Sequence, residues 1–566
     1  MLGTVDSQLE LLDANEFCGH LVPRDSIYRS LAQLGDQLFS DADFADMYET
    51  RGRHSIPPSL LAKILLLQTF EGASDRDTLQ HVRCDLRWKV ALHLSLQDEG
   101  FHHTVLTYFR ARLRTSEHPR RIFERFKEVA AEAGLLSKRG ARVLDSTPIF
   151  SAVQTEGTVS MIRSAMRRLL AQLDVETRRE VGAILRRNDY EQTGNPAIDW
   201  DDEAARVALV DELVRDALAV LKALEGMAVH PDVAREADTL ATVTGQDVEW
   251  DEGSGRFRIR RGVAPDRVIS TVDPEARHGR KSNQGHFDGY KAHVAVDPKT
   301  EIISEIQVTP ANVSDGAVAP DLLPELAEES VEITVVGDTA YGSGPTRSAL
   351  SELGATVIAK APPEQNSTGG FPKSAFNIDL TAGAATCPAG VTTTRVSRRA
   401  DGLHFRFPVA VCAQCPLRAN CTSSARGRTL HAGPYEAILA EARAFQLTDA
   451  FKAEYNSKRP TVERVISRLV RRGGRKARHR GRLRVQERLD LKAAIENFAR
   501  MTKLGLIWSG PGGWGSASTV APAYHDGTPS ARLAPIMSAL MKLRPQLPGI
   551  AHLGASQLPL AYAECH

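Results

Sequence analysis

Two stretches of the chain, RVLDST at residues 142–147 and ITVVGDTAY at residues 333–341, are short apolar runs that each reach an aspartate, Asp145 and Asp338. Such runs, when they end in small polar residues, are typical of buried strands that reach the rim of a sheet. Each aspartate alone could be a cap for the turn that follows its strand. The matching apolar run before both favours a second reading, in which two carboxylates at one rim share divalent cations.

The composition predicts a globular chain with no overall charge bias. Its 566 residues are enough for about two to four domains. Lys and Arg total 71 against 70 Asp and Glu, so partners must be inferred from local clusters. The densest apolar stretch, residues 60–70, is too short to span a bilayer, and residues 1–16 lack a basic signal-peptide start. We therefore expect a cytoplasmic protein with no membrane partner.

Four of the seven cysteines fall in one segment, at Cys387, Cys412, Cys415 and Cys421. Seven are too few for a disulfide scaffold in so long a chain. Four thiolates around one C-x-x-C pair can close a tetrahedral structural zinc site. Four reduced structural thiols are the alternative, whereas redox catalysis would leave the two outlying cysteines without a role.

The first part of the chain predicts short helices. Helical signals at residues 57–70, 74–82 and 103–113 are followed by basic residues. We expect the third of these helices to expose Arg110, Arg112 and Arg114, and the basic residues that follow it are Arg120, Arg121, Arg125 and Lys127. The pattern fits a helical DNA-binding domain over residues 1–135, or a helical bundle with a solvated basic face.

The remainder predicts a mixed α/β sheet with two insertions. Apolar residues at helical spacing predict a helical insertion over residues 155–250, with its exit at residues 253–255. The strand and helix candidates that follow are residues 286–296, 302–308, 332–338 and 355–361 for strands, and 317–328 and 345–353 for helices. The domains expected from this pattern are a catalytic domain at 136–382 and 433–504, a four-cysteine zinc module at 383–432, and a mostly disordered tail at 505–566.

Two-metal phosphoryl transfer calls for a third carboxylate after Asp338. Glu463 is the best candidate, in the first turns of a helix that we expect Pro460 to begin. Glu487 and Glu496 are the alternatives.

A dense basic run follows Glu463, and no acid interrupts it. Its members are Arg468, Arg471, Arg472, Arg475, Lys476, Arg478, Arg480, Arg482 and Arg484. Such a run would repel itself unless an anion neutralised it, and a phosphodiester backbone is the natural anion. A solvated charged face is the plainer reading. The run predicts nucleic-acid binding.

Taken in order, the motifs resemble the DDE transposases of bacterial insertion sequences, and among them the insertion sequence 1182 branch. The resemblance covers residues 48–504. Its motifs are RGR at 51–53, PP at 57–58, GASDR at 72–76, LDST at 144–147, FDGYKAH at 287–293, VVGDTAYG at 335–342 and RPTVER at 459–464. It implies a ribonuclease-H-like sheet in which Asp145, Asp338 and Glu463 bind two Mg²⁺ ions, with Mn²⁺ as a substitute.

In related transposases a tyrosine and a basic residue before the glutamate, and a basic residue after it, help to hold DNA. Arg459 has the expected spacing, but Tyr455 lies one residue too far away, and Val470 stands where the second basic residue is expected. On the strand at 286–296, Lys291 and His293 are either phosphate contacts or ordinary strand residues.

The resemblance further implies cleavage of a donor strand, its transfer into target DNA, and a homodimer on double-stranded DNA, at the nucleoid. Two other functions remain open. A transposase-derived DNA-binding protein would keep the helices and the basic run without catalysis. A ribonuclease-H-like nuclease would hydrolyse DNA without joining strands.

Overall fold

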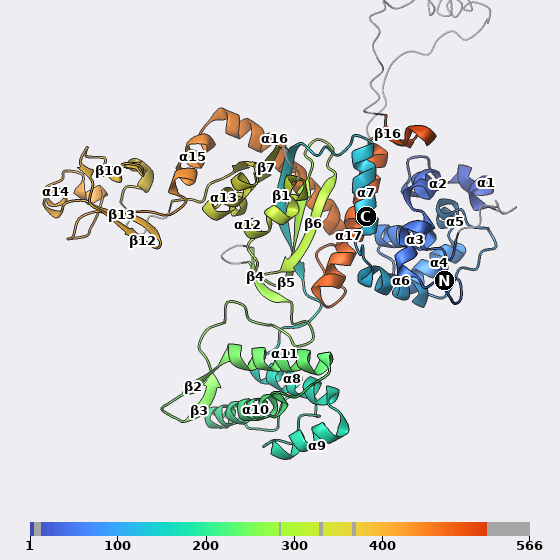
Figure 1. Ribbon diagram of the computed structural model, residues 1–566, viewed down its shortest axis with the longest axis horizontal. Coiled ribbons are helices and arrows are strands. Elements are labelled where there is room, and N and C mark those ends of the chain that lie inside the picture. Colours follow the sequence, from blue (N-terminus) through green and yellow to red (C-terminus); the bar gives the residue numbers. More distant parts are fainter. Residues whose placement is uncertain (5–12, 282–284, 328–331, 365–369, 518–566) are drawn as a thin grey trace, which may run out of the picture. The chain divides into compact units, whose positions relative to one another are not determined.

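The computed structural model describes residues 1–4, 13–281, 285–327, 332–364 and 370–517, and it contains a mixed sheet (Figure 1). Its strand order is β4-β5-β1-β7-β8, and β6 also pairs with β5. The strands are β1 (Gly140–Phe150), β4 (Arg277–Arg280), β5 (His286–Val296), β6 (Ile303–Pro310), β7 (Ile333–Gly337) and β8 (Thr356–Ala359). β1, β5 and β6 are antiparallel neighbours, whereas β7 and β8 run parallel to β1. The expected mixed α/β class is confirmed.

The N-terminal part is helical, as predicted. Its helices are α1 (Ala14–Cys18), α2 (Ile27–Leu38), α3 (Pro58–Glu71), α4 (Asp75–Cys84), α5 (Leu86–Leu92), α6 (Thr104–Thr115) and α7 (Arg121–Glu132). α3 has proline in its first turn and ends at Gly72, whose φ of 71° is left-handed. The side chain of Ser74 caps α4 by accepting from the N–H of Asp77. These helices share one hydrophobic core with a face of the sheet.

Most of the basic side chains of residues 110–127 are held in ion pairs. Of the three expected to be exposed, Arg112 is exposed, whereas Arg110 and Arg114 are half-buried. Arg110 pairs with Asp75, Arg114 with Glu487 at 2.8 Å, and Arg121 with Asp46 at 2.6 Å. Arg120 lies between Glu305 and Asp490, and Lys127 reaches Glu305. The acids come from distant parts of the chain, so the local sequence did not reveal them.

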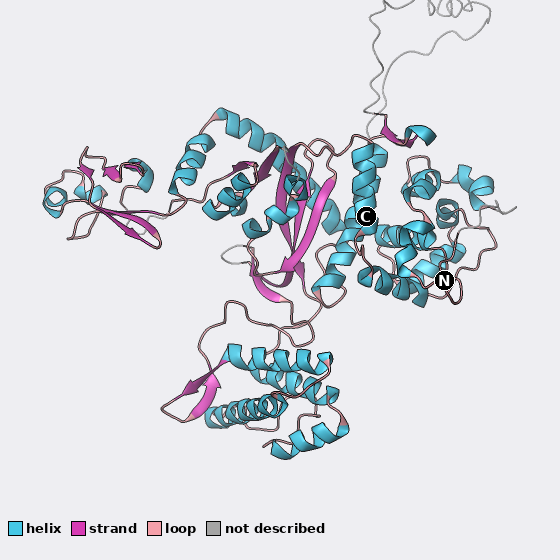
Figure 2. Ribbon diagram, viewed as in Figure 1, coloured by secondary structure: helices cyan, strands magenta, loops and turns pink. Residues whose placement is uncertain are grey.

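The insertion after β1 has its own hydrophobic core and is helical apart from one hairpin (Figure 2). Its elements are α8 (Thr158–Gln172), α9 (Val175–Ile184), α10 (Glu203–Leu224), α11 (Pro231–Asp247), β2 (Val248–Asp251) and β3 (Arg256–Ile259). Residues 253–255, expected as the exit, lie instead in the turn between β2 and β3. The core continues to Val268, so the insertion is longer than predicted.

The cysteine-rich module contains two small sheets around Phe376, Phe405 and Phe407. Its elements are β9 (Asn377–Asp379), β10 (Ala384–Thr386), β11 (Thr392–Thr393), β12 (Val396–Arg399), β13 (Gly402–Arg406), α14 (Val409–Ala413) and β14 (Thr429–Ala432). β9 pairs with β10, so this folded unit begins before residue 383.

Three long helices follow: α15 (Glu436–Gln446), α16 (Asp449–Arg471) and α17 (Arg482–Lys503). Thr448 caps α16, and Pro460 lies inside it instead of beginning it, which corrects the expected boundary. The proline lacks the N–H that would bond to the carbonyl of Asn456, but packing of α16 against the sheet offsets that loss.

The start of the expected disordered tail is ordered as a hairpin of β15 (Leu506–Trp508) and β16 (Trp514–Ser516). The rings of Trp508 and Trp514 are 5.1 Å apart. Residues 518–566 lie outside the described ranges. Among the helices described, none is both long and apolar enough to cross a membrane.

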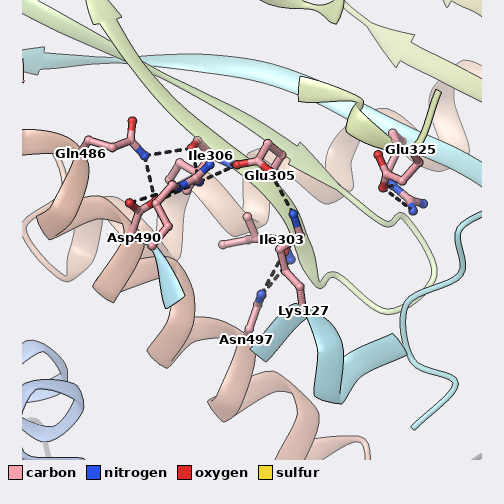
Figure 3. A network of polar contacts seen from close by, with 10 residues as sticks. Lys127, Ile303, Glu305, Ile306, Glu325, Gln486, Asp490 and Asn497 are labelled. Carbon is pink, nitrogen blue, oxygen red and sulfur yellow. Dashed lines mark hydrogen bonds and ion pairs between the residues drawn. The ribbon is translucent and has the colours of Figure 1, made fainter. Parts of the chain in front are cut away.

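Side chains satisfy the backbone at both outer edges of the sheet. On β6, Asn497 of α17 accepts from the N–H of Ile303 and donates to its carbonyl, while Gln486 accepts from Val308 and donates to Ile306 (Figure 3). On β8, Arg347 from α13 (Gly344–Glu352) donates to the carbonyls of residues 357 and 359. Each satisfied group is worth about 1 kcal/mol, and leaving it buried and unpaired would cost more.

Candidate functional site

Asp145 and Asp338 lie level with each other on adjacent parallel strands. The register pairs Val143 with Val336, and each aspartate follows two residues later. β7 ends at Gly337, whereas β1 continues beside β5 to Phe150. Asp145 therefore lies inside its strand, whereas the sequence predicted that it would end the strand. It reaches a rim because the neighbouring strand has stopped.

Both aspartates face α16. Side chains alternate along a strand, so Asp145 and Asp338 share the face of Val143 and Val336. Those valines belong to the same hydrophobic core as Val465 of α16, and α16 packs on β1, β5, β7 and β8. Asp145, Asp338 and α16 therefore line the same site.

Arg459 of α16 pairs with Asp145, its Nη2 lying 2.9 Å from Oδ2, and both side chains are mostly buried. Burial raises the pKa of the Asp145 carboxyl and the charge of Asp338 adds to it, while Arg459 and the N–H of Ser146 oppose the rise. Burial lowers the pKa of Arg459, but the two aspartates outweigh it and the net pKa is raised. Its Nη1 is buried with no hydrogen-bond partner among the described residues.

Tyr455, Arg459 and Glu463 follow one another at intervals of four residues, so they form one stripe along α16. Glu463 is exposed. Burial raises the pKa of Tyr455, and the charges of Asp338 and Glu463 add to that rise, so both carboxylates lie within its electrostatic reach. The spacing of Tyr455, which departs from the family pattern, still leaves it on the Arg459 side of the helix.

The alternative third acids have other partners. Glu487 pairs with Arg114, and Glu496 pairs with Arg468 and Arg472. Both glutamates lie on α17 and are held in these ion pairs.

Lys291 and His293 belong to a separate network around Asp315, a residue that the sequence analysis missed. The Nζ of Lys291 lies 2.8 Å from Asp315 Oδ1, and Ser146 donates to Oδ2. His293 is fully buried, with a pKa lowered to about 4 because burial disfavours its charged form. His293 pairs with Ser146 across β1 and β5, so it lies on the sheet face opposite Asp145. Contact between Lys291 and DNA stays a prediction.

The basic run continues from α16 through a loop into α17. Backbone hydrogen bonds between Phe150 and residues 475 and 477 tie that loop to the end of β1. The sequence argument that only an external anion could neutralise the run is wrong for three members. Arg468 pairs with Glu301 and Glu496, Arg472 with Glu496, and Arg482 with Glu275.

The other cations of the run remain available. Five of them are exposed and have no carboxylate within ion-pair distance among the residues that the structure describes. They are Arg471, Arg475, Lys476, Arg480 and Arg484. Arg478 donates to the carbonyl of Gly72. A cavity of about 620 Å³ opens beside them, the basic pocket, lined by Arg468, Arg471, Arg472, Arg478, Arg500 and Lys503 together with Glu71 and Glu496. Arg500 and Lys503 lie outside the run, so sequence density alone did not identify them.

The four predicted zinc cysteines line one pocket with Phe407 and Arg428. Burial raises the pKa of Cys421, and the other three thiols raise it further, so all four lie near one another. Among the described residues, no three of their sulfurs come within 4.8 Å of one another. The thiols are gathered, but more loosely than around a bound ion.

Two protein families match the chain. Residues 16–112 match the family described as Transposase domain (DUF772), and residues 253–498 match the Transposase DDE domain. The second match includes Asp338 and Glu463, whereas Asp145 lies between the two. No solved structure matches the chain. The mixed sheet fits the second of these families.

Proposed function

We propose that this chain, which its two family matches indicate to be an insertion-sequence transposase, binds the terminal repeats of its element and catalyses strand cleavage and strand transfer. The observation that carries this proposal is the level pair of Asp145 and Asp338, facing the helix that bears Glu463. Antiparallel β6-β5-β1 followed by parallel β7 and β8 supports a ribonuclease-H-like sheet. The motif order supports the insertion sequence 1182 branch.

The donor set at this place suits magnesium or manganese. Carboxylate oxygens are the ligands that hard divalent cations prefer, and Asp145, Asp338 and Glu463 would hold two such ions. When bound, the ions lower the pKa of the attacking hydroxyl and stabilise the leaving oxygen. Arg459 already supplies a positive charge beside Asp145.

Double-stranded DNA is the proposed partner of the basic run. The unpaired arginines and the basic pocket offer N–H donors and positive charge to a phosphate backbone. The loop of the basic run is tied to Phe150, so its cations lie next to the end of β1, the strand that carries Asp145. A homodimer on DNA at the nucleoid is proposed from the resemblance. Structural zinc on the four cysteines is proposed from their thiolate donors.

Strand transfer is the decisive experiment. The protein is incubated with Mg²⁺ and DNA that carries the terminal repeats of its element, and joined products are separated by electrophoresis. We expect joined products from the unaltered chain. Asp145→Asn, Asp338→Asn and Glu463→Gln should bind DNA but lose cleavage on the order of a thousandfold or more, because each removes a metal ligand.

Glu454→Gln is the matched control, since Glu454 is an exposed glutamate of α16 that pairs with Lys458. This variant should cut and join DNA as the unaltered chain does. Cleavage without joining would instead indicate a hydrolytic nuclease, and no cleavage even with Mn²⁺ would indicate a DNA-binding protein without catalysis. An active Glu463→Gln variant would move the third acid to Glu487 or Glu496.

A further inference from the structure

One histidine pair in the cysteine-rich module has no part in the proposed function. His404 of β13 and His431 of β14 are direct cross-strand partners, so their side chains project from the same face of that small sheet. Their rings are nearly parallel, with centroids 4.6 Å apart. Asp401 lies in the tight turn between β12 and β13, close to both rings.

Asp401 contacts the Nε2 atoms of both imidazoles. Its backbone carbonyl lies 2.8 Å from His431 Nε2, a hydrogen bond that a bound ion would replace. Its Oδ1 lies 2.9 Å from His404 Nε2, and its Oδ2 lies 3.6 Å from His431 Nε2. One ligand atom from each residue lies within 4.8 Å of the other two, and among the described residues no other group of three histidines, cysteines or acids is as tight. A tetrahedral ion with bonds of about 2.0–2.2 Å needs ligand atoms about 3.3–3.6 Å apart. The separation of 3.6 Å between Asp401 and His431 lies in that range, whereas the 2.9 Å between Asp401 and His404 is a hydrogen-bond distance that has to lengthen when an ion binds.

We propose that Asp401, His404 and His431 form a second metal site on this module, which binds zinc or another divalent first-row transition ion. Two imidazole nitrogens with one carboxylate oxygen suit such transition ions, whereas Mg²⁺ prefers oxygen ligands alone. The sheet register and the two-residue turn hold all three groups together, so little order has to be created on binding.

This site differs in kind from the four-cysteine site. Asp401 and His431 are 59% and 47% exposed, so water reaches the ion from the solvent side. Three protein ligands with one position left to water give an open site, whereas four thiolates give a closed structural one. The site does not depend on the chain being a transposase.

Zinc content is the direct test. Full-length protein without a histidine tag is dialysed against micromolar zinc, with millimolar magnesium present to occupy the carboxylates of the proposed active site. Bound zinc is then measured by mass spectrometry. We expect one zinc ion per chain more in the unaltered protein than in His404→Ala or His431→Ala. Asp401→Asn, a conservative change at an exposed turn, should lower the affinity of this site for zinc at least tenfold.

Two controls separate this site from other zinc ligands. His102→Ala alters another pair of neighbouring histidine rings, which are tilted with centroids 4.2 Å apart, and should leave the zinc content unchanged. In protein that already carries Cys412→Ser, adding His431→Ala should still lower the zinc content by one ion per chain. Cobalt added in place of zinc should give a difference spectrum between unaltered and His431→Ala protein without thiolate charge-transfer bands. Equal zinc content in the unaltered protein, both histidine variants and Asp401→Asn would overturn the proposal.

Discussion

Residues 110–127 and residues 468–484 are both rich in arginine, and both were expected to meet DNA. In the first stretch, carboxylates from distant segments pair with most of the cations. In the second, the carboxylates of the described residues reach Arg468, Arg472 and Arg482 and no other member. The density of arginines in a sequence therefore does not determine whether they are free for DNA, because the acids that neutralise them lie elsewhere in the chain.

Arg120 and Arg471 illustrate the two outcomes. Arg120 joins the N-terminal helices to Glu305 of β6 and Asp490 of α17, so its charge is used within the fold. Arg471 is exposed beside the basic pocket. The first stretch should therefore act mainly on stability and the second mainly on DNA affinity.

The largest effect is expected from Arg120→Met. This change leaves the buried carboxylate of Asp490 and that of Glu305 without their shared cation, so we expect the free energy of unfolding to fall by about 3 kcal/mol. Urea denaturation at neutral pH measures this loss. Arg112→Met, which alters an exposed arginine over the ring of Tyr48, should cost less than about 1 kcal/mol. The same loss in both variants would remove the distinction between paired and exposed cations.

The double variant Arg471→Gln, Arg478→Gln should weaken DNA binding about tenfold to a hundredfold, with the fold intact. Each lost phosphate contact should also lower the slope of log affinity against log salt by about one. Fluorescence anisotropy over a salt series measures both quantities. Arg235→Gln, which alters an exposed arginine of the helical insertion, is the control and should change neither. If Arg114→Gln weakened DNA binding as much, the first stretch would be a DNA surface too.

The smallest expected effect is on the pH dependence of stability, and it arises from a buried lysine near the second stretch. Burial, together with Arg488, Arg478 and Arg472, lowers the pKa of Lys492 from 10.5 to about 7, and its side chain is almost fully buried. The unfolded chain then binds more protons than the folded one between those values, so this lysine makes stability rise as the pH increases through that window.

Lys492→Met should abolish this contribution, which amounts to about 2 kcal/mol between pH 7 and pH 9. Urea denaturation at both pH values measures it, as the difference between the unaltered chain and the variant. An unchanged pH dependence in the variant would show that Lys492 is charged in the folded chain at both pH values.

Local patterns predicted those parts of the fold that depend on neighbouring residues. The runs before Asp145 and Asp338 are strands, and Pro58 and Ser74 begin helices as expected. Features that depend on distant segments were missed. Asp145 lies inside its strand because β1 continues beside β5, and it reaches a rim because β7 stops. α16 begins before Pro460 because tertiary packing outweighs the proline.

The candidate site divides in the same way. Asp145 and Asp338 could be predicted because each follows its own apolar run. Asp315, Arg500 and the group of Asp401, His404 and His431 could not, because only strand pairing and helix packing bring their partners near. The domain boundaries and the third acid stay predictions.

The side chains that satisfy the backbone of β6 and β8 restrict how two copies of this chain can meet. An unpaired strand edge is a template for another strand, and here Asn497, Gln486 and Arg347 already occupy the outward backbone groups. A second copy therefore gains little by extending this sheet. In the proposed homodimer on DNA, we therefore expect the copies to meet through helix surfaces or through the DNA itself, so that they can separate again without breaking a shared sheet.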